Sequence, residues 1–129
     1  MAKIQLENIS KRWGSFVGVD NFNLVIPDKE FLVLLGPSGC GKTTTMRMIA
    51  GLEEVTEGKV FINDRIVNDL DPKDRDIAMV FQSYALYPNL NVYENIRFPL
   101  RMRKTNPIEQ KEKVLRAAEM VELTDFLHR

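Results

Sequence analysis

Hydrophobic and polar residues alternate in two segments near the amino terminus. Within residues 3–10 the hydrophobic side chains of Ile4 and Leu6 lie two positions apart, and within residues 22–26 those of Phe22, Leu24 and Ile26 do the same. A period of two is typical of a strand with one buried face, because successive side chains of a strand point to opposite faces. Trp13 and Gly14 lie between the two segments, at a position suited to a turn. The pattern therefore predicts an antiparallel pair of strands.

Two later runs are hydrophobic without interruption. They cover residues 31–35 and residues 77–81. Continuous runs of this length are typical of strands buried on both faces, as in the centre of a parallel sheet, so we expect both runs to be core strands. Between them a short hairpin is predicted, since Asn63 and Asp64 tolerate a positive φ and separate two short hydrophobic segments.

A helix is predicted directly after a glycine-rich loop. It is expected to begin at Lys42 and to stop at Gly51, which can adopt the left-handed conformation that ends many helices. Met46, Ile49 and Ala50 recur at helical spacing and share one face. We expect this face to pack on the predicted sheet.

The carboxy-terminal part of the chain predicts two further helices. Asn91 followed by Glu94 is typical of a helix start, and Pro99 is expected to interrupt the interior of that helix. Asn106 and Pro107 indicate the start of the second helix. The hydrophobic face of the second helix is predicted to consist of Val114, Leu115, Ala118 and Val121.

The loop before the first predicted helix carries the spacing of a P-loop. Its residues are Gly36, Pro37, Ser38, Gly39, Cys40, Gly41, Lys42, Thr43 and Thr44. The pattern is a glycine, four free positions, then Gly-Lys followed by Ser or Thr. Glycines let several backbone N–H groups point at phosphate oxygens, and the positive end of the following helix lies on the same phosphates. These nine residues are therefore predicted to bind a nucleotide.

Individual residues of this loop have separate expected roles. Lys42 should reach the β- and γ-phosphates of ATP, and the Thr43 hydroxyl should ligate Mg²⁺. Cys40 occupies a free position that needs only a small side chain. The plain alternative is a glycine-rich turn that merely joins a strand to a helix. The order of predicted strand, loop and helix favours nucleotide binding.

Composition excludes several other classes of protein. The chain has 129 residues, and 18 basic side chains balance 18 acidic ones, so no overall charge attracts nucleic acid. One cysteine excludes an internal disulfide, and one cysteine with one histidine cannot form a typical zinc site. We expect neither a signal peptide nor a membrane-spanning segment, because no hydrophobic stretch follows Lys3 and residues 31–35 are too few to span a bilayer. We expect a soluble chain in a reducing cytoplasm.

Residues 31–100 resemble the ATP-binding subunits of ABC transporters, within the carbohydrate-import branch that includes maltose and glycerol-phosphate importers. Besides the P-loop, the stretch of residues 74–88, DRDIAMVFQSYALYP, looks like the Q-loop region of that family. The resemblance implies that Gln82 contacts Mg²⁺ or the attacking water. It also implies that Trp13 stacks on the adenine ring, a role that its π-face suits.

The same resemblance implies a fold and a set of partners. The fold would be α/β, with a P-loop NTPase (RecA-like) core, an amino-terminal antiparallel β subdomain and the start of an α-helical subdomain. Residues 1–88 would form the first two parts and residues 89–129 the third. The partners would be a second ATPase subunit, a transmembrane permease contacted by the loop from Ser83 to Tyr93, and indirectly a solute-binding protein. The subunit would lie peripherally on the cytoplasmic face of the cell membrane.

Some parts of an ABC ATPase have no counterpart in the sequence. We find no Leu-Ser-Gly-Gly-Gln-like segment, no acidic base after a second metal-binding strand and no switch histidine. The resemblance thus covers the first half of such a domain. We expect residues 1–129 by themselves to bind ATP without hydrolysing it.

Two other functions stay open from the sequence alone. A small metabolite kinase or a GTPase would also use a P-loop, although no guanine-reading Asn-Lys-x-Asp occurs. A nucleotide-binding module without turnover is the third possibility. The transported solute is not readable from this chain, because permease and binding-protein surfaces recognise it.

Overall fold

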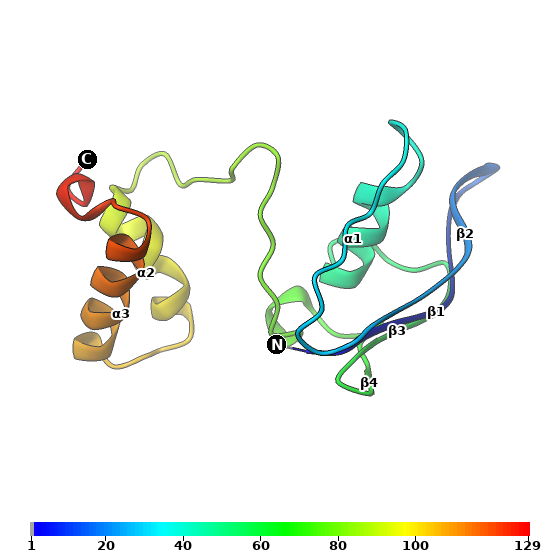
Figure 1. Cartoon of the computed structure of the whole chain (residues 1–129), viewed down its shortest axis with the longest axis horizontal. Coiled ribbons are helices and arrows are strands. Elements are labelled where there is room, and N and C mark those ends of the chain that lie inside the picture. The colour runs from blue at the N-terminus through cyan, green and yellow to red at the C-terminus, as the bar shows by residue number, and fades with distance from the viewer. Residues whose placement is uncertain (1) are drawn as a thin grey trace. The chain divides into compact units, whose positions relative to one another are not determined.

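The chain folds into two compact units. A computed structural model describes residues 2–129, and its contacts divide the chain after Met79, so that the second unit is Val80–Arg129 (Figure 1). Each unit is described by itself below. The division into functional subdomains after residue 88, implied by the resemblance, stays a prediction.

The first unit contains an antiparallel sheet. Its strands are β1 (Ile4–Trp13), β2 (Phe16–Ile26), β3 (Glu57–Ile62) and β4 (Arg65–Ile66), in the order β2-β1-β3-β4 (Figure 1). The predicted antiparallel pair is confirmed, with Ile4 opposite Ile26 and Trp13 opposite Phe16. β2 begins six residues earlier than the predicted segment that starts at Phe22, because its pairing with β1 continues to the turn.

The predicted hairpin between β3 and β4 is also confirmed. Asn63 and Asp64 have φ angles of 50° and 62°, the left-handed values that a two-residue hairpin turn requires. The side chain of Asn63 accepts a hydrogen bond from the Lys3 backbone N–H (3.1 Å), and the Asn63 N–H donates to the Lys3 carbonyl (2.9 Å). The turn is thereby fixed to the start of β1.

Helix α1 (Lys42–Ala50) packs on the sheet and ends at Gly51, whose φ is 77°, as predicted. The core of the unit consists of Leu6, Ile9, Val19, Met48, Val60, Ile62 and Val67. The predicted packing face was partly wrong. Met48 is fully buried, whereas the side chain of Met46 is 47% exposed, and Ile49 lies at the edge of the core. The helix is therefore rotated from the orientation that the sequence pattern suggested.

The prediction that residues 31–35 and 77–81 form core strands is wrong for this structure. Neither run belongs to a strand within the described part of the chain, and Phe31, Leu35 and Val80 are 85–88% exposed. A strand is stable only when neighbouring strands satisfy its backbone groups. The described sheet has no ladder to either run.

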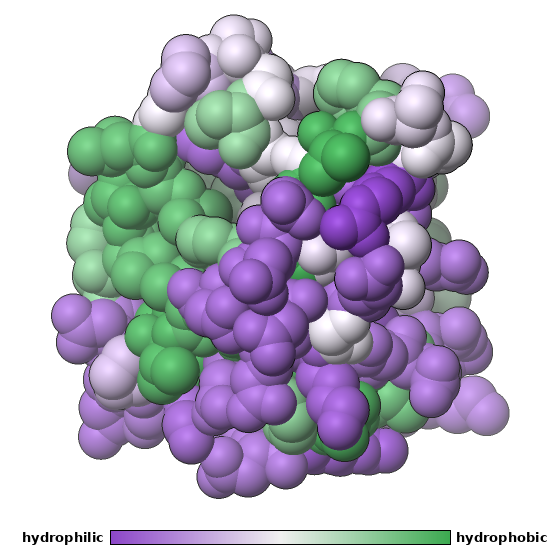
Figure 2. Space-filling view, turned by 90° about the vertical axis from the view of Figure 1, so that its right-hand side faces the viewer, coloured by the Kyte–Doolittle hydropathy of each residue, from purple (hydrophilic) through white to green (hydrophobic). Residues whose placement is uncertain are grey.

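Figure 2 shows a broad hydrophobic area beside a hydrophilic one on one face of the surface.

The second unit is a helical hairpin of α2 (Val92–Met102) and α3 (Pro107–Met120) (Figure 1). The side chain of Asn91 accepts a hydrogen bond from the Glu94 N–H (2.8 Å), and Asn106 caps α3 in the same way, so both predicted starts are confirmed. The predicted interruption at Pro99 is wrong, because α2 continues through it. A proline removes one helical hydrogen bond, and α2 continues through this gap while it packs against α3.

The hydrophobic face of α3 is narrower than predicted. Val114 and Ala118 are fully buried, but Leu115 and Val121 are 40% and 61% exposed. Gln110 takes a buried place instead, and its side chain accepts from Arg97 Nε (2.8 Å). Two short 3-10 helices complete the chain. They are η1 (Pro72–Asp74) in the first unit and η2 (Thr124–Phe126) in the second.

Arg75 fixes the carboxyl end of α1. Its side chain is only 6% exposed, and its guanidinium donates to the carbonyls of Met48 (2.9 Å), Ile49 (3.1 Å), Leu70 (2.9 Å) and Asn68 (3.2 Å). A cation at this end of a helix is favourable, because the helix dipole is negative there. Burial lowers the pKa of Arg75 from its usual value. The guanidinium therefore joins α1 to the segment that precedes residues 77–81.

We expect Arg75→Met to lower the free energy of unfolding by about 2–4 kcal/mol, because four carbonyls lose a charged donor. Arg75→Lys should restore part of the loss, since a point charge cannot reach all four carbonyls. Urea denaturation measures both. Lys73→Met serves as the control, since its ion pair with Asp71 is exposed and its loss should leave the transition in place. Equal midpoints for Arg75→Met and the unsubstituted protein would contradict this account.

Candidate nucleotide-binding site

The loop before α1 depends on glycines at two positions. Gly41, the N-cap of α1, has a φ of 89°, and a Cβ atom there would lie 2.6 Å from the Gly18 carbonyl oxygen of β2. A Cβ at Gly36 would lie 2.5 Å from the Cys40 sulfur. At Gly41 only glycine allows both the left-handed turn and the close approach to backbone, whereas at Gly36 the Cys40 side chain would have to move. The loop backbone is thus held tightly against β2 at one end.

Lys42 turns back over this loop. Its ammonium donates to the carbonyls of Gly36 and Pro37, each at 2.7 Å, and lies 3.3 Å from the Cys40 sulfur. Gly36 to Cys40 are exposed. The charge of Lys42 is therefore fixed at the surface of the loop. An anion can replace the two carbonyls there as the hydrogen-bond acceptor of the ammonium.

The amino-terminal end of α1 faces the same region. Gly41 cannot cap the helix with a side chain, and Thr45 is the first residue whose N–H donates within the helix, to the Gly41 carbonyl (2.8 Å). The N–H groups of the preceding first turn have no carbonyl four residues back within the helix. Thr43 lies in this turn and is exposed. Backbone donors, the helix dipole and a hydroxyl are thus presented together.

A hollow of about 380 Å³ brings this loop together with the β1–β2 turn. It is lined by Trp13, Phe16, Gly18, Ser38, Gly39, Gly41, Lys42, Thr43 and Thr44. Seven of these nine were predicted from the sequence as nucleotide-binding residues. Gly36, Pro37 and Cys40 do not line the hollow; they hold the ammonium of Lys42 from behind.

Trp13 forms one wall of the hollow and is 44% exposed. Its ring stacks against Phe16, with centroids 5.9 Å apart and planes inclined by 29°. A Cβ atom at Gly18 would overlap the indole, so the ring rests on the backbone of β2. The Lys11 ammonium lies over the ring, 5.3 Å from its centroid. The indole is therefore held by contacts on several sides.

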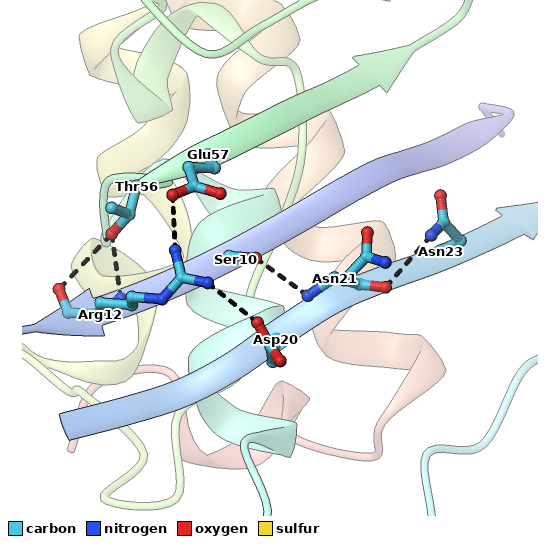
Figure 3. Close-up of polar contacts among 7 residues, drawn as sticks. All are labelled: Ser10, Arg12, Asp20, Asn21, Asn23, Thr56 and Glu57. Carbon is cyan, nitrogen blue, oxygen red and sulfur yellow. Dashed lines mark hydrogen bonds and ion pairs between the residues drawn. The ribbon is translucent and has the colours of Figure 1, made fainter. Parts of the chain in front are cut away.

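An ion-pair network holds the strands together next to Trp13. Arg12 donates to Asp20 on β2 (3.0 Å) and to Glu57 on β3, as Figure 3 shows. The Arg12 backbone N–H also donates to the Thr56 hydroxyl (3.0 Å). One side chain of β1 thus joins both neighbouring strands. Because these charges are partly exposed, we expect the network to align the strand ends more than to add stability.

Comparison with known proteins places this geometry in a family. The ABC transporter family matches residues 19–129. The chain belongs to the ABC transporter family.

Curated relatives match over the whole chain. It is 53% identical to the osmoprotective compounds uptake ATP-binding protein of Synechocystis sp. and 54% identical to the oligosaccharides import ATP-binding protein of Bacillus subtilis. It is 51% identical to the trehalose/maltose import ATP-binding protein of Thermococcus litoralis. The chain spans about 36% of the length of each of these relatives.

A solved structure has the same fold. It is a dimeric ATP-binding cassette in a post-hydrolysis state with ADP and Pi, which is 34% identical and superimposes with a TM-score of 0.85. The match covers 98% of this chain and 60% of that cassette. The predicted ABC-type α/β fold is thereby confirmed. Among residues 2–129, no helix is both long and apolar enough to cross a bilayer.

Gln82 lies in the second unit of this ABC transporter chain. It is exposed, in a turn closed by the Tyr84 N–H donating to the Phe81 carbonyl (3.0 Å). Its role as a ligand of Mg²⁺ or water stays a prediction. In the following loop Tyr87 packs on Phe98 with ring centroids 4.3 Å apart, whereas Tyr84 and Leu86 are 79% and 72% exposed. The loop therefore has both a packed ring and free hydrophobic side chains.

Sequence reasoning missed two residues of this site. Gly18 is not among the residues predicted for the site, but its backbone lies against both Trp13 and Gly41. Lys11 was not singled out, although it is almost fully buried beside Trp13. Its one available signal was its place two residues before Trp13, which puts both side chains on one face of a strand.

Substitutions at two glycines can distinguish the effect of backbone strain from that of the close contact between the loop and β2. Gly39 has a φ of 80° with nothing near its Cβ position, whereas Gly41 meets the Gly18 carbonyl. We expect Gly39→Ala to lower the free energy of unfolding by about 1 kcal/mol and Gly41→Ala by about 2–4 kcal/mol. Urea denaturation measures both values. Equal losses would show that the contact between the loop and β2 is not needed.

Proposed function

We propose that this chain binds ATP with Mg²⁺ in the hollow between Trp13 and the P-loop. The observation that carries the proposal is that one hollow is lined both by an exposed indole and by the nucleotide-binding loop. A base needs an aromatic platform, and a triphosphate needs backbone donors and a cation. The volume of about 380 Å³ falls within the range of small-molecule sites.

The phosphate end of the nucleotide would lie on the loop. Lys42 would exchange its two carbonyl acceptors for oxygens of the β- and γ-phosphates, since a charged acceptor forms the stronger hydrogen bond. Backbone N–H groups from Gly39 to Thr44 would bind the remaining oxygens. The Thr43 hydroxyl would ligate Mg²⁺, which would neutralise phosphate charge, and Gln82 is proposed to contact Mg²⁺ or the attacking water.

The whole protein is proposed to hydrolyse ATP to ADP and phosphate and to couple this reaction to solute import. Relatives at 51–54% identity carry the names of uptake or import ATP-binding proteins for osmoprotective compounds, oligosaccharides and trehalose or maltose. A sugar or a similar polar solute is therefore the proposed cargo. Lys42 and Gln82 are the proposed catalytic residues of this chain.

The proposed partners follow from the same relatives. A second ATPase subunit is proposed because the similar solved cassette is dimeric. A transmembrane permease is proposed to receive the loop from Ser83 to Tyr93, whose Tyr84 and Leu86 are exposed. A solute-binding protein would act through the permease. The subunit would lie on the cytoplasmic face of the membrane without spanning it.

Lys42→Ala should weaken ATP binding by about ten- to a hundredfold, because a charge-assisted contact to phosphate contributes about 1.5–3 kcal/mol. Isothermal titration calorimetry with Mg²⁺ and ATP measures the two dissociation constants. Lys3→Ala is the matched control, since that lysine pairs with Asp64 at the edge of the sheet. Equal affinities for Lys42→Ala and the unsubstituted protein would contradict the assignment.

Trp13 is the only tryptophan, so its fluorescence reports directly on the proposed base platform. ATP should change the emission in a saturable way. Trp13→Ala should lose about 1–3 kcal/mol of binding, the scale of base–aromatic stacking, and Trp13→Phe should retain much of it. Emission that does not change under saturating ATP would show that the base binds elsewhere.

Hydrolysis needs a group that orients water, besides the phosphate cradle. The described residues that line the hollow include no carboxylate and no histidine. We therefore expect residues 1–129 alone to bind ATP without turnover, which is also the behaviour of a plain binding module. The measurement is phosphate release by residues 1–129 with Mg²⁺ and ATP, compared with phosphate release by the Lys42→Ala variant. Turnover near about 1 s⁻¹ that the variant abolishes would reveal a base within this chain.

A further inference from the structure

Lys11 is a buried cation beside the proposed base platform. Its side chain is only 10% exposed, and its ammonium lies 2.6 Å from Glu53 Oε1 and 2.8 Å from the Glu54 carbonyl oxygen. The same ammonium lies 5.3 Å from the centroid of the Trp13 ring. Lysine is seldom buried, because removing its charge from water is costly. Its three donors and its position over a ring therefore call for an explanation beyond packing.

The anchor of Lys11 belongs to the end of the P-loop helix. The N–H groups of Leu52 and Glu53 both donate to the Arg47 carbonyl (2.9 and 3.3 Å), which closes the last turn of α1. α1 begins at Lys42, in the phosphate-binding loop. Through Glu53, Lys11 thus connects the strand that carries Trp13 to the helix that carries the loop.

Three contacts restrict the Trp13 ring. Lys11 lies over it, Phe16 stacks against it, and the Gly18 backbone supports it. Gly18 and Phe16 both belong to β2 and carry no charge. Lys11 is different, because an ammonium over an indole is attracted electrostatically to the ring, most strongly where water is excluded. A substitution that removes the charge of Lys11 but keeps its side-chain volume should therefore loosen the indole without leaving a cavity.

We infer that Lys11, fixed by Glu53, is a positioning residue that holds the Trp13 indole ready to stack on the purine base. This inference rests on the proposed binding of ATP. When an exposed side chain becomes ordered only on binding, the lost conformational entropy reduces the affinity. A ring that is already held avoids this cost. The phosphate loop should be indifferent to Lys11 if the effect passes through Trp13.

A ligand without a base separates this role from a structural one. Inorganic tripolyphosphate with Mg²⁺ can occupy the loop but offers nothing to Trp13. Calorimetry with ATP and with tripolyphosphate therefore measures the base contribution as a ratio of two affinities. Lys11→Met keeps most of the side-chain volume and removes the charge. Lys3→Met is the matched control, because Lys3 forms its ion pair at an exposed site.

We expect Lys11→Met to weaken ATP binding by about three- to tenfold and to leave tripolyphosphate binding within about twofold. Lys11→Arg should recover ATP affinity, since a guanidinium also stacks on an indole. Combined with Trp13→Ala, Lys11→Met should have no further effect on ATP. The tryptophan emission of unliganded Lys11→Met should shift, whereas that of Lys3→Met should not.

Glu53→Gln provides a second variant that keeps a hydrogen-bond acceptor for Lys11, so it tests the inference should Lys11→Met not fold. Glu53→Gln should weaken the binding of ATP more than that of tripolyphosphate, as Lys11→Met does, but to a smaller extent. Equal weakening of ATP and tripolyphosphate, or an undiminished effect in the Trp13→Ala background, would show a structural role and overturn the inference. Failure of the unsubstituted protein to bind ATP would overturn the proposed function as well. ATP binding that Lys11 variants leave unchanged would overturn the inference alone.

Discussion

The close approach of β2 to the P-loop at Gly18 and Gly41 is the constraint on which the site depends. Gly18 has no side chain, so the Trp13 indole rests on its backbone, and its carbonyl lies where a side chain at Gly41 would project. Both glycines are needed for one contact. It brings an aromatic ring from one hairpin and a phosphate loop from a distant segment to the walls of a single hollow.

Elements on either side keep this contact in place. The Arg12 network aligns the ends of β1, β2 and β3 (Figure 3), and Arg75 holds the far end of α1. The Lys11–Glu53 pair joins the sheet to that same helix end. The hollow is therefore built on regular elements with fixed ends, as the proposed binding of a base and a triphosphate at a set separation requires.

Local signals predicted local structure well. The P-loop spacing, the Asn63-Asp64 turn and the caps at Asn91 and Asn106 each depend on a few neighbouring residues, and the structure confirms the elements that they predicted. Residues 31–35 and 77–81 failed as strands because a strand depends on partners elsewhere in the chain. Gly18 and Lys11 were not predicted for a similar reason, since their roles depend on contacts with residues far along the chain.

The central claim is that ATP binds between Trp13 and the P-loop. The most direct test follows backbone amide and indole N–H signals by two-dimensional NMR while Mg²⁺ and ATP are added. The account predicts that the largest shifts occur at the amides of residue 36 and residues 38–44, at Gly18 and at the Trp13 indole N–H. Saturating ATP that leaves the signals of these residues unchanged would contradict it.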